Sequence, residues 1–197
     1  MMDNIFTVVN TAVAGTISII LLALKQTFMR KKCDPIEAQN NVDENIMTAI
    51  EFLCQELDAD RIIIQEFHNG GKYFSGNSQQ KLSITYERCK RGVSSIFRRF
   101  QNVRVSALSN ILKHSMTDQI LVQLDDERCA YSYDLQTHGT TSAAFTILKT
   151  LTNKNIGLLS IHYVNRSKTK LTEREKDLIN RQRRIISGYL VSHKITT

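Results

Sequence analysis

The pattern of hydrophobic and polar positions begins with a long stretch that contains no charge. Residues 4–24 are uncharged, and most of their side chains are apolar. About 20 such residues, each rising about 1.5 Å along a helix, match a hydrocarbon core of about 30 Å. The pattern predicts a single membrane-spanning helix inside an anchor of residues 1–28. A cleaved signal peptide would need basic residues before the apolar run, and a core helix is rarely uncharged on all sides.

A second pattern, with steps of three and four, follows the anchor. Apolar residues recur at this spacing from Val42 to Leu57, and the Asp34-Pro35 pair supplies an N-cap and a first-turn proline. We therefore predict an amphipathic helix that ends near Asp58 and lies in a connecting segment, residues 29–58. We favour a helix that covers a sheet. The alternatives are that it transmits a movement from the anchor or pairs with its copy in a dimer.

Strand patterns dominate the rest of the chain. Strands are predicted over 61–68, 81–89, 142–150 and 156–164, with a tight turn at 69–71 and a hairpin turn at 152–155. Short helices and loops are expected over 93–115, and another short helix over 117–124. A capping box, Thr172 to Glu175, then opens a long helix with an apolar stripe. This order predicts an α+β fold: an antiparallel sheet whose terminal helices pack on one face, within a domain of residues 59–197.

Three segments resemble parts of the GAF domain, a relative of the PAS domain. They are the opening amphipathic helix running into DADRIIIQEFHNGG, the hairpin ending in NIGLLSIHYVN, and the link into LTEREKDLINRQRRIISGYL. GAF domains hold cyclic nucleotides, tetrapyrroles, haem or small metabolites against the sheet, or act as dimerisation units. The resemblance implies a GAF-like sensory or binding module. None of the residues specific to those ligand classes is matched in this sequence.

A narrower resemblance concerns phage proteins. The segment FHNGGKYFSG followed by KLSITYE is similar to small bacteriophage proteins with a membrane anchor and a GAF-like body. The layout is also similar to the holins of T-even phages, which have one N-terminal span and a periplasmic α/β domain that senses a lysis-timing signal. This resemblance implies a phage holin-type protein that oligomerises in the inner membrane and times host-cell lysis. It is the alternative to the sensory module.

Charge bears on the orientation in the membrane and on the partners. The chain has 26 basic and 19 acidic residues and a net charge of +7, and four basic residues follow the uncharged stretch within eight positions. The positive-inside rule then places the domain in the cytoplasm, whereas the holin resemblance requires the periplasm. The expected partners are the lipid bilayer, a second copy of the chain, and a regulatory protein or small ligand.

One candidate ligand site is a polar cluster on two predicted strands. Side chains alternate along a strand, so Glu66 and His68 share a face, and Thr85 and Glu87 share a face of the next strand. Placed opposite each other beside the Asn69-Gly70 turn, they would form a pH-sensitive or ligand-binding pocket. The alternative, which we favour, is a strand end that becomes polar where it leaves the core.

The densest basic run offers a second candidate surface. It interleaves arginines and a lysine with two phenylalanines and comprises Arg88, Lys90, Arg91, Arg98, Arg99 and Arg104. No nucleic-acid recognition motif accompanies the run, so a solvated basic surface accounts for it better than nucleic-acid binding.

Catalytic and metal chemistry have no signature in the sequence. The four cysteines are 21 to 40 positions apart without a CxxC pair, and the five histidines form no HExxH or HxH motif. There is also no GxSxG elbow and no P-loop. We therefore expect a protein that is not an enzyme, with no metal and no cofactor, and with cysteines in the thiol form unless the domain faces an oxidising compartment.

Overall fold

The computed structural model describes residues 34–73, 75–116, 120–124 and 129–192. The predicted anchor, residues 1–28, lies outside the described residues. Chain contacts divide the molecule into two units, Met1–Ala38 and Gln39–Thr197. The second unit contains both hydrophobic cores and every strand pair given below, so we expect it to fold without residues 1–33. Within the described ranges, no helix has the length and apolar character needed to cross a membrane.

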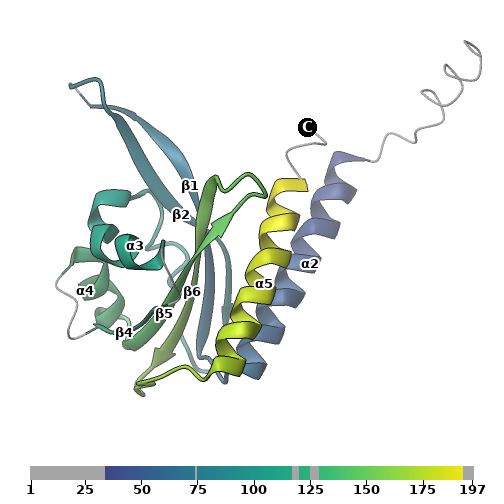
Figure 1. Cartoon of the computed structure of the whole chain (residues 1–197), viewed down its shortest axis with the longest axis vertical. Coiled ribbons are helices and arrows are strands. Elements are labelled where there is room, and N and C mark those ends of the chain that lie inside the picture. Colours follow the sequence, from purple (N-terminus) through teal and green to yellow (C-terminus); the bar gives the residue numbers. More distant parts are fainter. Residues whose placement is uncertain (1–33, 74, 117–119, 125–128, 193–197) are drawn as a thin grey trace, which may run out of the picture. The chain divides into compact units, whose positions relative to one another are not determined.

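The described residues form an antiparallel six-stranded sheet in the order β3-β2-β1-β6-β5-β4 (Figure 1). The strands are β1 (Arg61–Lys72), β2 (Ser78–Cys89), β3 (Val103–Arg104), β4 (Ile120–Gln123), β5 (Thr140–Lys149) and β6 (Asn155–Val164). The helices are α2 (Pro35–Glu56), the short 3₁₀ helix η1 (Val105–Leu108), α3 (Ser109–Ser115), α4 (Ala130–Thr137) and α5 (Glu173–Ser192). The predicted α+β class and antiparallel sheet are confirmed.

Both long helices begin where their sequence signals place them. The Asp34 side chain accepts a hydrogen bond from the backbone N–H of Ile36 at 2.8 Å, which satisfies a donor in the first turn of α2. At α5, Thr172 and Glu175 exchange the two side-chain-to-backbone bonds of a capping box, at 3.3 and 2.8 Å. These local signals fix the starts of α2 and α5 independently of tertiary packing.

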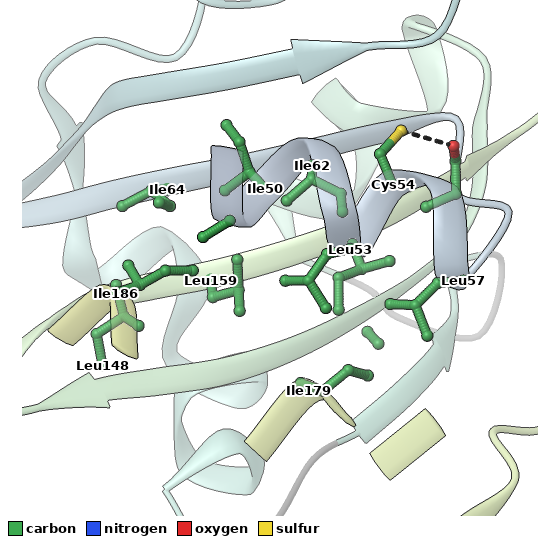
Figure 2. Close-up of a cluster of buried hydrophobic side chains, with 14 of the residues drawn as sticks. Ile50, Leu53, Cys54, Leu57, Ile62, Ile64, Leu148, Leu159, Ile179 and Ile186 are labelled. Carbon is green, nitrogen blue, oxygen red and sulfur yellow. Dashed lines mark hydrogen bonds between the residues drawn. The ribbon is translucent and has the colours of Figure 1, made fainter. Parts of the chain in front are cut away.

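The first hydrophobic core lies between one face of the sheet and the helices α2 and α5, as predicted. Figure 2 shows this layer: α2 contributes Ile50, Leu53, Cys54 and Leu57, the strands contribute Ile62, Ile64, Leu148 and Leu159, and α5 contributes Ile179 and Ile186. The two helices run antiparallel, because Arg174 in the first turn of α5 approaches Glu56 at the end of α2, at 4.0 Å.

The second core covers the opposite face of the sheet. There α3, α4 and the segment 96–100 pack their apolar side chains on β1, β2, β5 and β6. Its aromatic residues meet edge to face: Tyr131 of α4 lies 5.2 Å from Phe100 and 6.4 Å from Phe145, measured between ring centroids. The sheet is therefore buried on both faces, which explains the near-continuous apolar runs of β5 and β6.

Two sequence predictions are wrong in detail, and one helix was not predicted. Residues Ile120–Gln123 form the edge strand β4, which pairs with β5, where a helix was expected. Strand pairing with β5 prevails over the local pattern there, as tertiary context often does. The turn expected at Asn69-Gly70-Gly71 lies further along: β1 continues to Lys72, and the Tyr73 N–H donates to the Asn77 carbonyl just before β2 begins. The helix α4 was not predicted.

A bulge at Thr85 corrects the predicted faces of β2. Ile64 pairs with Tyr86 and Gln65 with Ile84, so Thr85 is an extra residue without an opposite partner. Before the bulge, Leu82 and Ile84 belong to the second core, but after it Tyr86 packs on the first core. Glu87 consequently points to the opposite face from the one that the simple alternation assigns to it.

Candidate functional site

Part of the predicted ligand cluster comes together at one end of the sheet. Glu66, His68 and Asn69 line a cavity of about 500 Å³ on the face that α5 covers. The β5–β6 hairpin and the last turns of α5, through Leu190 and Val191, complete the cavity wall. The His68 ring nitrogen Nε2 lies 2.8 Å from the Ser83 hydroxyl, and Asn69 accepts a bond from Gln80 at 2.9 Å. These side chains bond across the β1–β2 ladder, as expected of a strand that becomes polar near its end.

The other predicted members lie apart from this cavity or beside it. Gly70 packs against the Lys81 side chain on the paired strand. Thr85 is exposed at the bulge, where its hydroxyl reaches the Ile64 carbonyl at 3.5 Å. Glu87 lies on the second-core face, near the other end of β1. The six residues therefore do not form one pocket, and the role of the three in the cavity stays a prediction.

Glu87 instead belongs to an ion pair in the interior. Its carboxylate lies 3.7 Å from the Nε of Arg61, and their side chains are 6% and 0% exposed. Glu87 also accepts the backbone N–H of Ile96 at 2.9 Å, and Arg61 donates to the Ser94 carbonyl at 2.9 Å. A third bond joins Arg61 to the Thr140 hydroxyl at 3.1 Å. The pair links the loop before the 96–100 segment to the start of β1 and the end of β2.

Around Arg61 the second core contains a group of polar side chains, which we call the buried polar cluster: Arg61, Gln65, Tyr131 and His162. Arg61 and His162 face each other on β1 and β6, and Tyr131 of α4 donates to the Gln65 side chain at 2.8 Å. Among the described residues, the Nε of Arg61, the Nε2 of Gln65 and both ring nitrogens of His162 have no hydrogen-bond partner. A buried polar group without a partner costs about 1–3 kcal/mol, so the cluster calls for water or a ligand.

Burial keeps the cluster close to electrically neutral. Removal from water, and secondarily the charge of Arg61, hold the pKa of His162 well below its usual 6.5, so the ring is uncharged at neutral pH. Burial also raises the pKa of Tyr131, which keeps its hydroxyl protonated. The Arg61 charge is balanced by Glu87. The cluster therefore offers hydrogen-bond donors and acceptors beside aromatic rings, with no net charge.

Sequence reasoning missed this cluster, although a signal was present. Arg61 and Gln65 sit at alternate positions with Ile63 in β1, and Ser160 and His162 alternate in β6, inside otherwise apolar runs. Polar residues that recur with period two on a buried face mark an unusual core. Glu66 and His68, by contrast, fit a strand that becomes polar where it leaves the core, and they stand out in the sequence because they follow an apolar run.

The predicted basic surface is partly neutralised. Arg88 pairs with Glu51, Lys90 with Asp58 at 2.6 Å, and Arg99 with Asp134 at 3.6 Å. Arg91, Arg98 and Arg104 are exposed. Half of the run thus forms ion pairs with acidic residues of the same domain, in keeping with a solvated surface.

Thiol chemistry has little support in the described part of the chain. Cys54, Cys89 and Cys129 are free there, and Cys33 lies outside it. Burial raises the pKa of the Cys89 thiol to about 11, so little thiolate forms at neutral pH. Within the same ranges, no three potential metal ligands of the His, Cys, Asp and Glu types gather in one place.

Comparison with solved structures identifies the fold. A far-red cyanobacteriochrome photoreceptor matches with a TM-score of 0.62 and 12% identity, over 92% of this chain and 98% of that one. The blue-light absorbing form of the PixJ GAF domain from Thermosynechococcus elongatus matches at 0.60 and 11%, over 81% and 89%. A GAF domain from Synechocystis sp. PCC6803 matches at 0.58 and 9%, over 78% and 96%.

Sequence comparison adds no closer relationship. No protein-family model and no curated protein sequence matches the chain. At identities of 9–12% the structural likeness concerns the fold and carries no ligand from one protein to the other. The GAF part of the predicted resemblance is confirmed at that level: the chain has the fold of a GAF domain.

Proposed function

We propose that the chain is a non-catalytic, membrane-anchored sensory module whose GAF-like domain binds a small planar heterocycle at the buried polar cluster. One observation carries the proposal: four buried side-chain nitrogens, the Nε of Arg61, the Nε2 of Gln65 and both ring nitrogens of His162, have no hydrogen-bond partner among the described residues. Cores rarely retain such groups unless they serve a function, because apolar residues of similar size would be more stable. The cyanobacterial neighbours add the context of a photoreceptor fold.

The chemistry of the cluster limits the kind of ligand. Phe145 lies 6.1 Å from the His162 ring, and Tyr131 and Phe100 complete an aromatic group on the same face. Aromatic faces favour a flat ring, and the amide and imidazole nitrogens favour a ring with polar edges. Because Tyr131 comes from α4, ligand entry requires α4 to move away from the sheet. That movement would couple binding to conformation.

Ligand extraction tests this proposal. We expect one small heterocyclic compound to be enriched in denatured extracts of residues 34–197 purified from bacteria, measured by mass spectrometry against a blank preparation. H162L should lose the compound. H68L, the same exchange on the opposite face, should retain it. Absence of any enriched compound from wild type and H68L would contradict the proposal, and loss in H68L alone would place the site in the β1–β2 cavity instead.

We further propose that residues 1–28 tether the domain to the inner membrane. The support is the uncharged stretch 4–24 and the basic residues that follow it. After carbonate extraction, we expect the full chain to remain in the membrane pellet and a chain starting at residue 34 to appear in the supernatant. Recovery of the full chain in the supernatant would contradict the proposal that residues 1–28 anchor the domain in the membrane.

Expression of the full chain and of the chain starting at residue 34 also tests the lytic alternative, which the uncharged stretch favours too. A holin-type protein would kill the expressing cells abruptly once its spans oligomerise, and killing would require residues 1–28. Unchanged growth and membrane potential during expression of the full chain would exclude that role. A phage origin stays part of this alternative only.

A further inference from the structure

The polar side chains of β1 and β6 that enter the second core share one face of these two neighbouring strands. Arg61 of β1 lies opposite His162 of β6, and Ile63 lies opposite Ser160. Residues two apart on a strand share a face, so Gln65 points to the same core. At about 3.3 Å per residue, the row of polar groups from Arg61 to Gln65 is about 13 Å long. The four polar side chains of this row are 0% exposed.

Two members of the row can only donate hydrogen bonds at their unpartnered atoms. The Nε of Arg61 carries one N–H and the Nε2 of Gln65 carries two, and neither nitrogen is an acceptor. Both nitrogens lack a hydrogen-bond partner among the described residues. The Gln65 carbonyl oxygen is already occupied, because it accepts the Tyr131 hydroxyl at 2.8 Å. Arg61 and Gln65 therefore need acceptor atoms from a bound molecule.

His162 and Ser160 do not supply enough acceptors. Burial lowers the pKa of His162, so its ring is uncharged at neutral pH and has one donor and one acceptor nitrogen. The Ser160 hydroxyl both donates and accepts. These three atoms also lack a hydrogen-bond partner within the described ranges. Taken together, the donor hydrogens of the row outnumber its acceptor lone pairs, so a ligand has to bring more acceptors than donors.

The charge and the aromatic neighbours of the row restrict the ligand further. Arg61 has its counter-charge in Glu87, whose carboxylate lies 3.7 Å from the Arg61 Nε. A further charge of either sign would be buried there without a partner, which is costly. Uncharged acceptors are carbonyl oxygens and ring nitrogens. The rings of Tyr131 and Phe145, 6.4 Å apart between centroids, favour a flat group that carries such atoms.

We propose that the buried polar cluster, together with Ser160, binds an uncharged planar ring whose edge carries carbonyl oxygens, as in pyrimidinediones and pteridinediones. The carbonyl oxygens accept from Arg61 and Gln65, and the remaining ring atoms pair with His162 and Ser160. A ring of the same shape with amino groups in place of the carbonyls would set N–H against N–H. This inference rests on the proposed heterocycle site and names the chemistry of its ligand.

Two probes of matched shape test the inference: lumazine, which is pteridine-2,4-dione, and 2,4-diaminopteridine. The full chain in a neutral detergent is bound to an affinity column, washed with urea to release any bacterial compound, and refolded. Thermal unfolding, followed by circular dichroism at neutral pH, then reports binding. Lumazine should raise the melting temperature with an apparent affinity about 25-fold above that of the diamine, since the diamine forfeits two hydrogen bonds and each is worth about a factor of five.

The exchange Gln65→Glu should reverse this preference. The new carboxyl group still accepts the Tyr131 hydroxyl but no longer offers an amide NH₂, so lumazine should bind more weakly and the diamine more tightly. Gln80→Glu, the same exchange at an exposed position of β2, should bind both probes as wild type does. Ser160→Ala removes one hydroxyl and should weaken lumazine binding about fivefold, which provides a second measurement if the Gln65 variant does not fold.

The outcomes separate this inference from the proposed function. Equal affinities for the two probes, or a preference of the wild type for the diamine, would overturn the carbonyl-edged ligand and leave the heterocycle site in place. Equal effects of the Gln65 and Gln80 exchanges would overturn it too, as would the absence of a shift with either probe. Ligand extraction from the wild type then decides the proposed function separately: an enriched compound supports the site, and its absence contradicts it.

Discussion

Replacing Arg61 with methionine should destabilise the domain by about 3–5 kcal/mol, the cost of breaking a buried ion pair from one side. The exchange removes the donors to Ser94 and Thr140 and leaves the Glu87 carboxylate, with its side chain 6% exposed, without its counter-charge. Methionine fills much of the same volume, so lost packing contributes little. Urea unfolding of residues 34–197, followed by circular dichroism, measures the difference.

A second substitution, at Glu87, separates the cost of the unpaired buried charge from the cost of the lost Arg61 hydrogen bonds. Glu87→Gln keeps an oxygen that accepts the Ile96 N–H but removes the charge, so R61M/E87Q should be about 1–2 kcal/mol more stable than R61M. Arg99→Met serves as the surface control: its ion pair with Asp134 is more than half exposed on the arginine side, and its loss should cost less than about 1 kcal/mol. An R61M protein as stable as R99M would show that the interior pair is not a structural support.

Replacing His162 with leucine should stabilise the ligand-free domain by about 1–3 kcal/mol at pH 7.5. When the wild type folds, the two ring nitrogens of His162 lose their bonds to water and gain no hydrogen bond from the protein, and leucine avoids this cost. The gain should grow to about 3–5 kcal/mol at pH 5.0. The folded-state pKa of His162 is lowered, mainly by burial, whereas in the unfolded chain it returns to about 6.5. Below pH 6.5 the unfolded wild type therefore takes up a proton that the folded protein does not accept.

The sign of the pH dependence follows from that difference. The unfolded state binds more protons as the pH falls through 6.5, so the wild type loses stability in this direction, by about 2 kcal/mol between pH 7.5 and 5.0. H162L lacks the titrating group and should lose correspondingly less over the same range. H162F, which has a different shape but also lacks the imidazole, should show the same reduced slope. Equal slopes in the three proteins would mean that His162 titrates normally inside the fold.

The sequence patterns predicted the helices and strands that are marked by residues close together in the chain. The caps at Asp34 and Thr172 and the helical spacing of the α2 stripe predicted both long helices. The apolar runs of β1, β5 and β6 and the alternation in β2 predicted the strands at the centre of the sheet. The edge strand β4 depends on a partner distant in the chain, β5. Its local pattern alone did not distinguish a strand from a short helix.

The candidate site was harder to foresee, for a physical reason. Glu66 and His68 appear polar on a strand, and the structure places them together, but whether Glu87 joins them depends on the register at Thr85. The buried polar cluster draws residues from β1, β6 and α4, and α4 itself was not predicted. Its members become neighbours only once the strand order β1-β6 is known.

The extra residue at Thr85 has a consequence for how β2 is shared between the two layers of the molecule. Up to Ile84 the apolar side chains of β2 pack on the α3 and α4 side. Beyond Thr85 the faces exchange, and Tyr86 packs on the α2 and α5 side. If Thr85 occupied a regular position in the strand instead of bulging, alternation from Ile84 would direct Tyr86 toward the aromatic layer and Glu87 toward the underside of α2. Each of the two cores would then receive a side chain of the wrong polarity from β2. The bulge at Thr85 therefore keeps β2 in register with both cores.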